Sequence, residues 1–163
     1  MKSTALAEHI VSKETKWSNH DCYDVKTLVE TDHHEREDGV FAKLVRLDPE
    51  TPGRQPLYRI CLQDTRILEF VQKREIDMCS LLTFIMTHEL LHIHRFSTGK
   101  ADFFEALRED EEVHVDNLTR LFLAKNPVTG LKNVLTLLDN VEAAPLYSFT
   151  ICVEHGRYYN AYL

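Results

Sequence analysis

The feature that most constrains this chain is the stretch from residue 75 to residue 96. Apolar side chains recur there on nearly every face of a helix: Ile76, Leu81, Leu82, Phe84, Ile85, Met86, Leu90, Leu91 and Ile93. A helix that is apolar all round belongs in a protein interior. Its longest near-apolar run, Leu81 to Met86, is interrupted by Thr83 and is far too short to span a bilayer. The sequence therefore predicts a buried helix around which the rest of the chain packs.

Two histidines and a glutamate stand inside this apolar helix, in the pattern H-E-x-x-H from His88 to His92. Residues four apart lie one turn apart on the same helical face, so both imidazoles can reach one metal ion. Glu89 is rotated by about 100 degrees from His88, which places it beside such an ion and not among its ligands. Because unpaired polar groups cost several kcal/mol in apolar surroundings, the pattern favours a metal site.

A zinc site of this type needs a third protein ligand and leaves one position to water. Its candidates lie in a second expected helix, from about residue 102 to residue 125, with Asp102 as N-cap. Glu111 shares an inward stripe, at steps of three or four, with Phe104, Leu107, Val115, Leu118 and Phe122. Glu111 is therefore the preferred third ligand, and Glu109 is a weaker one.

Glu111 and Glu112 follow His92 by 19 and 20 residues, which resembles the gluzincin branch of the zincin metallopeptidases. The resemblance covers about residues 75–125. It implies a zincin-like fold and one Zn²⁺ per chain, with Glu112 as the third ligand. It also implies that Asp116, four residues later, supports a zinc-binding histidine. His114 is a further alternative, since zincins with three histidine ligands exist.

The same resemblance implies a small zinc metallopeptidase, a hydrolase that cleaves peptide bonds in a peptide or protein substrate. Zinc lowers the pKa of its bound water to about 7, and Glu89 is then the general base that passes the proton to the leaving amine. The substrate would lie extended along an edge strand, with residues 40–47 or 57–62 as the candidates. A donor to the developing oxyanion is expected from His155, Tyr158, Tyr159 or Tyr162.

Two other functions remain alternatives. Glu89-x-x-His92 and Glu111-x-x-His114 are both E-x-x-H pairs, which two helices of a carboxylate-bridged di-iron bundle contribute. Such a bundle needs two further helices with inward glutamates and leaves His88 without a role. The other alternative is a non-catalytic binding module in which a metal only stabilises the fold.

The rest of the sequence predicts a single α+β domain over residues 1–163, with a metal-site core at about residues 75–125. A small antiparallel or mixed sheet packs on the buried helix, and the second metal-site helix closes the site. The other expected elements are a hairpin of strands 40–47 and 57–62, a strand at 146–153, short helices at 3–10 and 131–138, an ambiguous strand or helix lead-in at 63–72, and a solvated charged loop at 30–38.

Composition excludes several classes of protein. The 163 residues carry a net charge of −7 with no basic patch, so no nucleic-acid partner is expected. The four cysteines stand far apart and are expected to be reduced and mostly buried. The first residues lack the apolar run of a signal peptide, so a cytoplasmic protein without a membrane partner is expected. The small size indicates a narrow peptide substrate, or a protein partner or homo-oligomer that completes the cleft.

Overall fold

The computed structural model describes residues 2–18, 22–36, 38–49, 51, 53–104, 109–140 and 150–155. In chain order the elements are α1 (Lys2–Thr15), β1 (Tyr23–Lys26), the 3₁₀ helix η2 (His33–Glu35), β2 (Ala42–Asp48), β3 (Leu57–Leu62), α2 (Asp64–Arg74), α3 (Met78–Ser97), α4 (Glu109–Lys125), α5 (Leu131–Asn140) and β4 (Thr150–His155). The predicted α+β class is confirmed.

The strands form a four-stranded mixed sheet in the order β1-β3-β2-β4. The predicted hairpin is confirmed, because β2 pairs antiparallel with β3, with Ala42 opposite Leu62. The pairs β1/β3 and β2/β4 are parallel. The prediction that residues 40–47 or 57–62 form an edge strand is wrong, because β1 and β4 pair outside them. β1 is only four residues long and gave no sequence signal.

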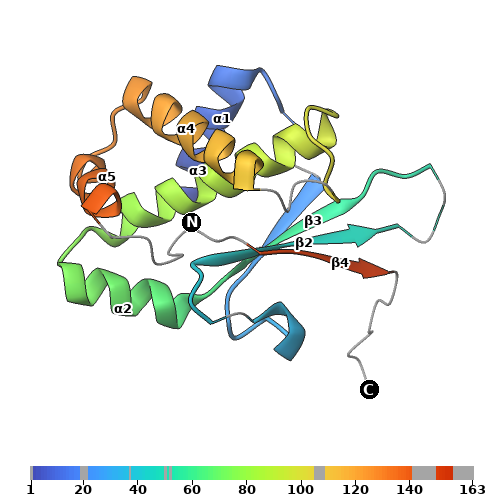
Figure 1. Cartoon of the computed structure of the whole chain (residues 1–163), viewed down its shortest axis with the longest axis horizontal. Helices are drawn as coiled ribbons and strands as arrows, with labels where there is room; N and C mark the ends of the chain where they lie inside the picture. Colours follow the sequence, from blue (N-terminus) through green and yellow to red (C-terminus); the bar gives the residue numbers. More distant parts are fainter. Residues whose placement is uncertain are drawn as a thin grey trace.

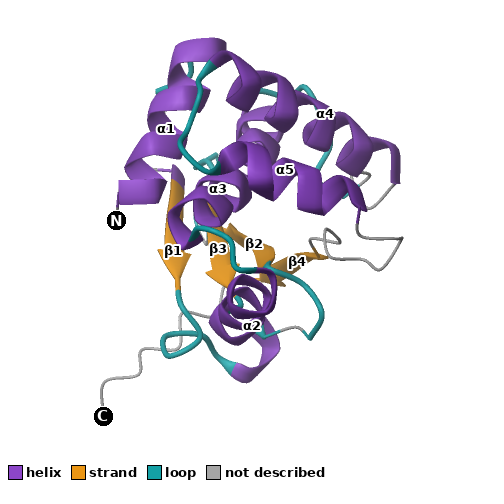
Figure 2. Cartoon of the chain, turned by 90° about the vertical axis from the view of Figure 1, so that its left-hand side faces the viewer, coloured by secondary structure: helices purple, strands orange, loops and turns teal. Residues whose placement is uncertain are grey.

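Helices α1, α3, α4 and α5 lie on one side of the sheet, and α2 lies beyond the end of the sheet at which β3 finishes (Figures 1 and 2). The all-round apolar pattern of α3 has the expected consequence, since nearly all of its residues are buried. Its side chains form one core with those of α1, β2 and β3, including Ile10, Leu44 and Ile60. Among the described residues, no helix combines the length and apolar character needed to cross a membrane.

Helix α3 begins at Met78, three residues later than the apolar pattern predicts. Asp77 is its N-cap, and its carboxylate accepts hydrogen bonds from the Ser80 amide at 2.7 Å and the Ser80 hydroxyl at 2.6 Å. Glu75 adopts φ 51° and ends α2 in the left-handed conformation. Residues 64–74 therefore form a separate helix, neither a strand nor a lead-in to α3.

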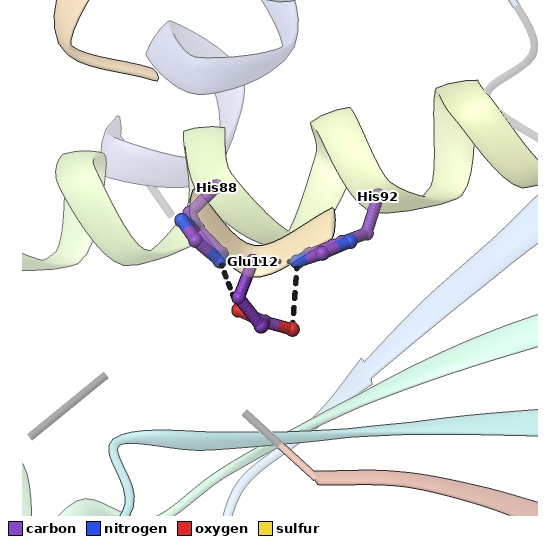
Figure 3. Close-up of side chains that lie close together, drawn as sticks. All are labelled: His88, His92 and Glu112. Atoms are coloured by element: carbon purple, nitrogen blue, oxygen red, sulfur yellow. Dashed lines mark hydrogen bonds and ion pairs between the residues drawn. The ribbon is translucent and has the colours of Figure 1, made fainter. Parts of the chain in front are cut away.

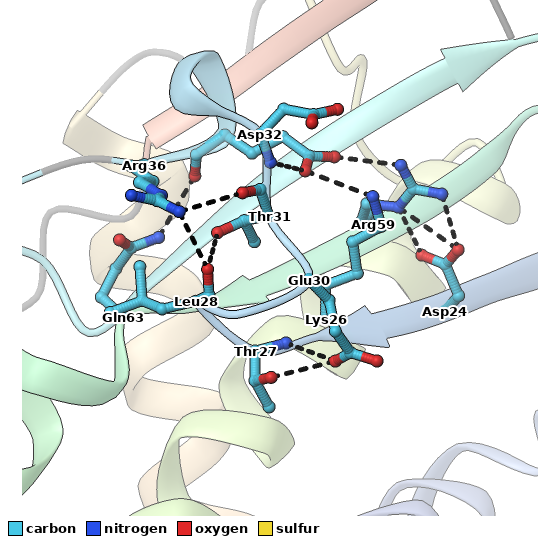
Figure 4. A network of polar contacts seen from close by, with 11 residues as sticks. Asp24, Lys26, Thr27, Leu28, Glu30, Thr31, Asp32, Arg36, Arg59 and Gln63 are labelled. Carbon is cyan, nitrogen blue, oxygen red and sulfur yellow. Dashed lines mark hydrogen bonds and ion pairs between the residues drawn. The ribbon is translucent and has the colours of Figure 1, made fainter. Parts of the chain in front are cut away.

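Most described residues of the charged run at residues 30–38 are exposed, as its composition predicts, but Thr31 and Glu35 are buried. The run contains η2, which lies on the face of the sheet opposite the four helices (Figure 1), and Glu35 of η2 is only 1% exposed. Figure 4 shows its polar partners Asp32 and Arg59 together with Asp24. The Glu35 carboxylate accepts hydrogen bonds from Arg59 Nη1 at 3.0 Å and from the Asp32 amide at 2.9 Å. Arg59 also binds Asp24 through two nitrogens. Charged partners thus offset the cost of burying a charged side chain.

These contacts set the protonation of Glu35. Burial raises the pKa of its carboxyl, but the hydrogen bonds from the Asp32 amide and Arg59 and the positive charges of Lys26 and Arg59 outweigh burial, so the pKa is lowered. A group with a lowered pKa in the folded state stabilises the fold above its unfolded pKa, and this stabilisation disappears as the pH falls through the folded pKa.

We expect Glu35→Gln to lower the free energy of unfolding at pH 7 by about 1–3 kcal/mol, because Arg59 loses a charged partner in a buried position. The difference from the unmodified protein should shrink as the pH falls below about 4.3, the unfolded pKa of glutamate. Urea unfolding at several pH values measures both effects. Glu69→Gln, at a half-exposed position with a distant Lys73 partner, is the control and should be nearly neutral. A Glu35→Gln difference that does not depend on pH would contradict the prediction.

A second prediction concerns Gly130, in the turn between α4 and α5. Its φ is 82°, and a Cβ placed there would lie 2.7 Å from Ser80 Oγ, which lies 2.6 Å from the Thr129 carbonyl oxygen. We expect Gly130→Ala to destabilise the fold by about 1–3 kcal/mol through this crowding, in addition to backbone strain. Gly99→Ala, with φ 69° and open space around it, shares only the strain. If Gly130→Ala and Gly99→Ala lower the thermal stability of the fold equally, the proposed crowding against Ser80 is wrong.

Candidate metal centre

Helix α3 presents the rings of His88 and His92 side by side on the face that meets α4 (Figure 3). The two Nε2 atoms lie 3.1 Å apart, and each side chain is 1% exposed. Both positions follow from the four-residue spacing within a continuous helix. The aromatic ring of Phe96 stacks on His92, and Phe84 lies beside His88, so apolar rings flank the pair. The two ring nitrogens therefore converge on one point inside an apolar region.

Glu112 of α4 completes this cluster. Its Oε2 lies 3.3 Å from His88 Nε2, and its Oε1 lies 3.2 Å from His92 Nε2. One ligand atom from each of the three residues falls within 4.8 Å of the others. A single carboxylate thus spans both imidazoles, with its side chain 26% exposed.

These distances match the spacing that a metal ion imposes on its ligands. Two atoms about 2.0–2.1 Å from one ion, held at the tetrahedral angle, lie about 3.3–3.4 Å apart. The two Nε2 atoms lie 3.1 Å apart, and each lies 3.2 or 3.3 Å from a different oxygen of Glu112. Two imidazole nitrogens and one carboxylate are a ligand set that suits Zn²⁺. The three side chains therefore need little rearrangement to hold a divalent ion.

The electrostatics of the cluster are also those that a metal requires. Burial raises the pKa of Glu112, but hydrogen bonds from His88 and His92 outweigh it and lower the pKa to about 2. Burial lowers the pKa of His88 and opposes its protonation, although Glu112 acts in the other direction. Metal ligands must be an ionised carboxylate and neutral imidazoles. Glu112 and His88 are held in these forms at neutral pH.

Glu89 lies next to the cluster without joining it. Its side chain is fully buried, and neither carboxylate oxygen accepts a hydrogen bond from a described residue. Burial, followed by the negative charge of Glu112, raises the pKa of Glu89 well above its usual value. A buried carboxylate without partners is costly to keep. A nearby cation, or water bound to one, would provide Glu89 with a partner.

The structure brings Glu112, not the preferred Glu111, to the histidine pair. Glu111 instead receives two hydrogen bonds from Arg95 of α3, from Nε at 2.6 Å and from Nη2 at 2.9 Å. Its Oε1 also lies 3.9 Å from Nδ1 of His92, the ring nitrogen that points away from the cluster. This separation is too long for a hydrogen bond, and Nδ1 of His92 accepts or donates none among the described residues. Arg95 was not predicted as a site residue. The signal for it in the sequence was its positive charge close to His92, which an acid of the next helix could pair with.

The inward stripe of α4 explains this difference. Phe104, which supported Glu111, precedes α4 and is 56% exposed. The fully buried positions are Val115, Thr119 and Leu123, which continue from Glu112 at steps of three and four. Thr119 can be buried because its hydroxyl donates to the Val115 carbonyl at 2.8 Å. Residues 103–104 form a turn, so α4 does not begin at Asp102.

The other candidates have different placements. His114 is exposed and lies away from the histidine pair. Asp116 pairs with Arg120 at 2.7 Å, while its other oxygen is buried without a hydrogen bond from a described residue. Its charge acts to raise the pKa of His88, against the larger effect of burial, which lowers it. The backbone of His155 ends β4 opposite Asp48. The side chains of His155 and Glu109, and Tyr158, Tyr159 and Tyr162 entirely, lie outside the described residues.

We expect Glu112→Ala to weaken Zn²⁺ binding more than Glu111→Ala does. Loss of an outer partner of a ligand costs about 10–100-fold in metal affinity, so Glu111→Ala, which removes only the Arg95 pair beside His92, should lose no more than that, and Glu112→Ala should lose more. His114→Ala, at an exposed position, is the matched control and should bind as the unmodified chain does. Competition titration with a chromophoric zinc chelator measures all three. A larger loss of Zn²⁺ affinity in Glu111→Ala than in Glu112→Ala would make Glu111 the third ligand.

Comparison with protein-family models, with curated proteins and with solved structures finds no match to this chain. No family is therefore shown. The functional conclusion depends on the geometry of His88, His92 and Glu112 and on the adjacent Glu89.

Proposed function

We propose that this protein is a zinc-dependent hydrolase of the gluzincin type, a small metallopeptidase. The observation that carries the proposal is the triangle of two Nε2 atoms and one carboxylate, with sides of 3.1 to 3.3 Å. Beside it lies the buried Glu89, which accepts no hydrogen bond from the described residues. A purely structural contact between the two histidines and Glu112 would leave Glu89 unexplained. A catalytic site needs both parts together.

The arrangement of elements supports a zincin-like fold. Helix α3 carries both histidines and packs along a small mixed sheet, and the next helix, α4, supplies the carboxylate. Asp116 acts on His88 through its charge and stands four residues after Glu112, where the resemblance expects a supporting carboxylate. These are the relationships that the gluzincin resemblance implies for residues 75–125.

Glu89 performs the proton transfers in this proposal. A bound divalent ion would polarise the substrate carbonyl and acidify a water molecule. Glu89 projects from α3 about 100 degrees from His88, so it faces the same space without occupying a ligand position. Its carboxylate takes the proton of the attacking water and returns it to the leaving amine, and its apolar surroundings favour the protonated intermediate form. Burial also excludes competing solvent.

The sheet limits where an extended peptide can bind. β2 and β3 have a partner strand on both sides, so a substrate strand can add only at β1 or β4. β1 lies beside β3 at one edge of the sheet, and β4 lies beside β2 at the other. A peptide substrate is therefore expected at one of these two edges and not along residues 40–47 or 57–62.

The structure gives less support to the two alternatives. In a di-iron site the second E-x-x-H pair would have to join the first, but His114 is exposed and Glu111 pairs with Arg95. A sheet also occupies the side of α3 where a bundle would place its other helices (Figure 2). A non-catalytic binding module uses the same metal ligands as an enzyme. The role of Glu89 distinguishes that alternative from a hydrolase.

We expect Glu89→Gln to bind Zn²⁺ as the unmodified chain does and to lose hydrolytic activity by about 10²–10⁴-fold, the usual contribution of a general base. Cleavage of a quenched fluorescent peptide library, with zinc content measured on the same samples, tests both expectations. Glutamine keeps the size of the side chain and removes only its charge.

His114→Ala, on the exposed side of α4, is the control variant and should retain full activity. Two results contradict the proposal. One is a zinc-loaded chain that cleaves no peptide in the library, with Glu89→Gln identical to it. The other is two iron atoms per chain, which would support the di-iron alternative.

A further inference from the structure

A second cavity lies away from the metal centre, between α1, the start of α3 and the turn that joins α4 to α5. Its volume is about 740 Å³, within the range of about 300–1,000 Å³ that is typical of small-molecule sites. None of His88, Glu89, His92 or Glu112 lines it. The cavity is thus separate from the proposed active site, and binding there would not depend on hydrolase activity.

One part of the cavity wall is apolar. Leu6 and Ile10 of α1 face Pro127 and Val128 of the α4–α5 turn. Leu6 is one of the exposed large apolar residues of the chain, with 37% of its surface accessible. Contact with the apolar body of a ligand would remove this surface from water, which favours binding.

The rim of the same cavity is basic. Lys2, Lys13 and Lys125 line it together with His9, although the chain as a whole has a net charge of −7. Lys13 Nζ donates to Asn126 Oδ1 at 2.7 Å, a neutral partner that holds the ammonium group without cancelling its charge. Glu14 partly offsets Lys125, 3.6 Å away, and also lies close enough to Lys13 for that charge to help lower the pKa of Glu14.

One acid, Asp77, lies among the described lining residues and offsets part of this charge. Its carboxylate accepts hydrogen bonds from the amide and the hydroxyl of Ser80, which lower its pKa and keep it ionised. Three lysines line the cavity against this single carboxylate, so the lining keeps an excess of positive charge beside an apolar wall. This combination is complementary to a molecule with an apolar body and a negatively charged group.

We propose that this cavity binds a small amphiphilic carboxylate, with its apolar part against Leu6 and Val128 and its carboxylate toward Lys2 and Lys13. The volume fits a molecule of one or two aromatic rings or an equivalent aliphatic chain. The proposed ligand is a small molecule. An acidic peptide is the alternative that the experiment must distinguish.

The cavity contains its own reporter group, the thiol of Cys79. Among the three cysteines whose side chains the structure describes, Cys79 is exposed in the lining, whereas Cys22 and Cys61 are buried. The neutral disulfide 4,4′-dithiodipyridine therefore should label Cys79 before Cys22 and Cys61. The thiolate attacks one sulfur of the reagent, a mixed disulfide forms, thiopyridone leaves, and the thiol proton passes to the buffer. Cys79→Ser identifies the part of the absorbance change that belongs to this residue.

The experiment measures the labelling rate of Cys79 in the full chain with increasing 1-naphthoate. We expect saturable protection, with the rate reduced at least fivefold at saturation. The neutral analogue 1-naphthalenemethanol should need at least a tenfold higher concentration for the same effect. Lys2→Gln with Lys13→Gln should weaken naphthoate protection at least tenfold. Lys73→Gln, an exposed lysine of α2 with 72% accessible surface, is the matched control and should leave it unchanged.

Three results would overturn the proposal. Equal protection by naphthoate and the neutral alcohol would show an apolar cavity without charge recognition. Protection that rises linearly with naphthoate and never saturates would show no site. Protection by an oligoglutamate peptide, with none by naphthoate, would assign the surface to an acidic peptide. Because labelling does not depend on hydrolysis, a failure here is distinguishable from failure of the proposed enzyme.

Discussion

The structure depends on how four ionisable side chains are paired where the apolar helix α3 packs against α4. His88, Glu89 and His92 stand on the buried helix α3, and α4 adds Glu112 to them. Placing such groups in an apolar interior costs several kcal/mol unless they are paired. Glu112 is paired, and the histidines lower its pKa. Glu89 has no hydrogen-bond partner among the described residues, and burial raises its pKa. A cation between them would improve both situations at once.

The position of α4 on α3 is therefore as important as the motif itself. Arg95 and Glu111 join the two helices by a two-pronged ion pair close to His92, and their exposure is only 16% and 11%. A partly buried pair of this geometry fixes direction as well as distance. It holds the start of α4 against α3, and the next residue, Glu112, then reaches both imidazoles.

Much of this arrangement could be predicted from periodicity. The all-round apolar pattern identified α3 as buried, and alternation identified the hairpin of β2 and β3. Periodicity could not decide between the adjacent Glu111 and Glu112. The inward stripe of α4 that continues from Glu112 contains the polar Thr119, so it does not read as an apolar stripe in the sequence. Thr119 can be buried there because its hydroxyl bonds to the backbone of the same helix. Burial of Glu35 was equally invisible, since its partner Arg59 lies on a distant strand. Long-range pairing of charged residues leaves no local pattern.

Adjacent acids on one helix cannot perform the same task, because successive side chains diverge by about 100 degrees. Here the divergence separates two roles on a single imidazole. Glu112 approaches His92 through Nε2 at 3.2 Å, whereas Glu111 lies 3.9 Å from Nδ1 of the same ring. The pair Glu111-Glu112 therefore places one carboxylate on the side of each nitrogen of His92, which explains why sequence spacing alone pointed to both residues.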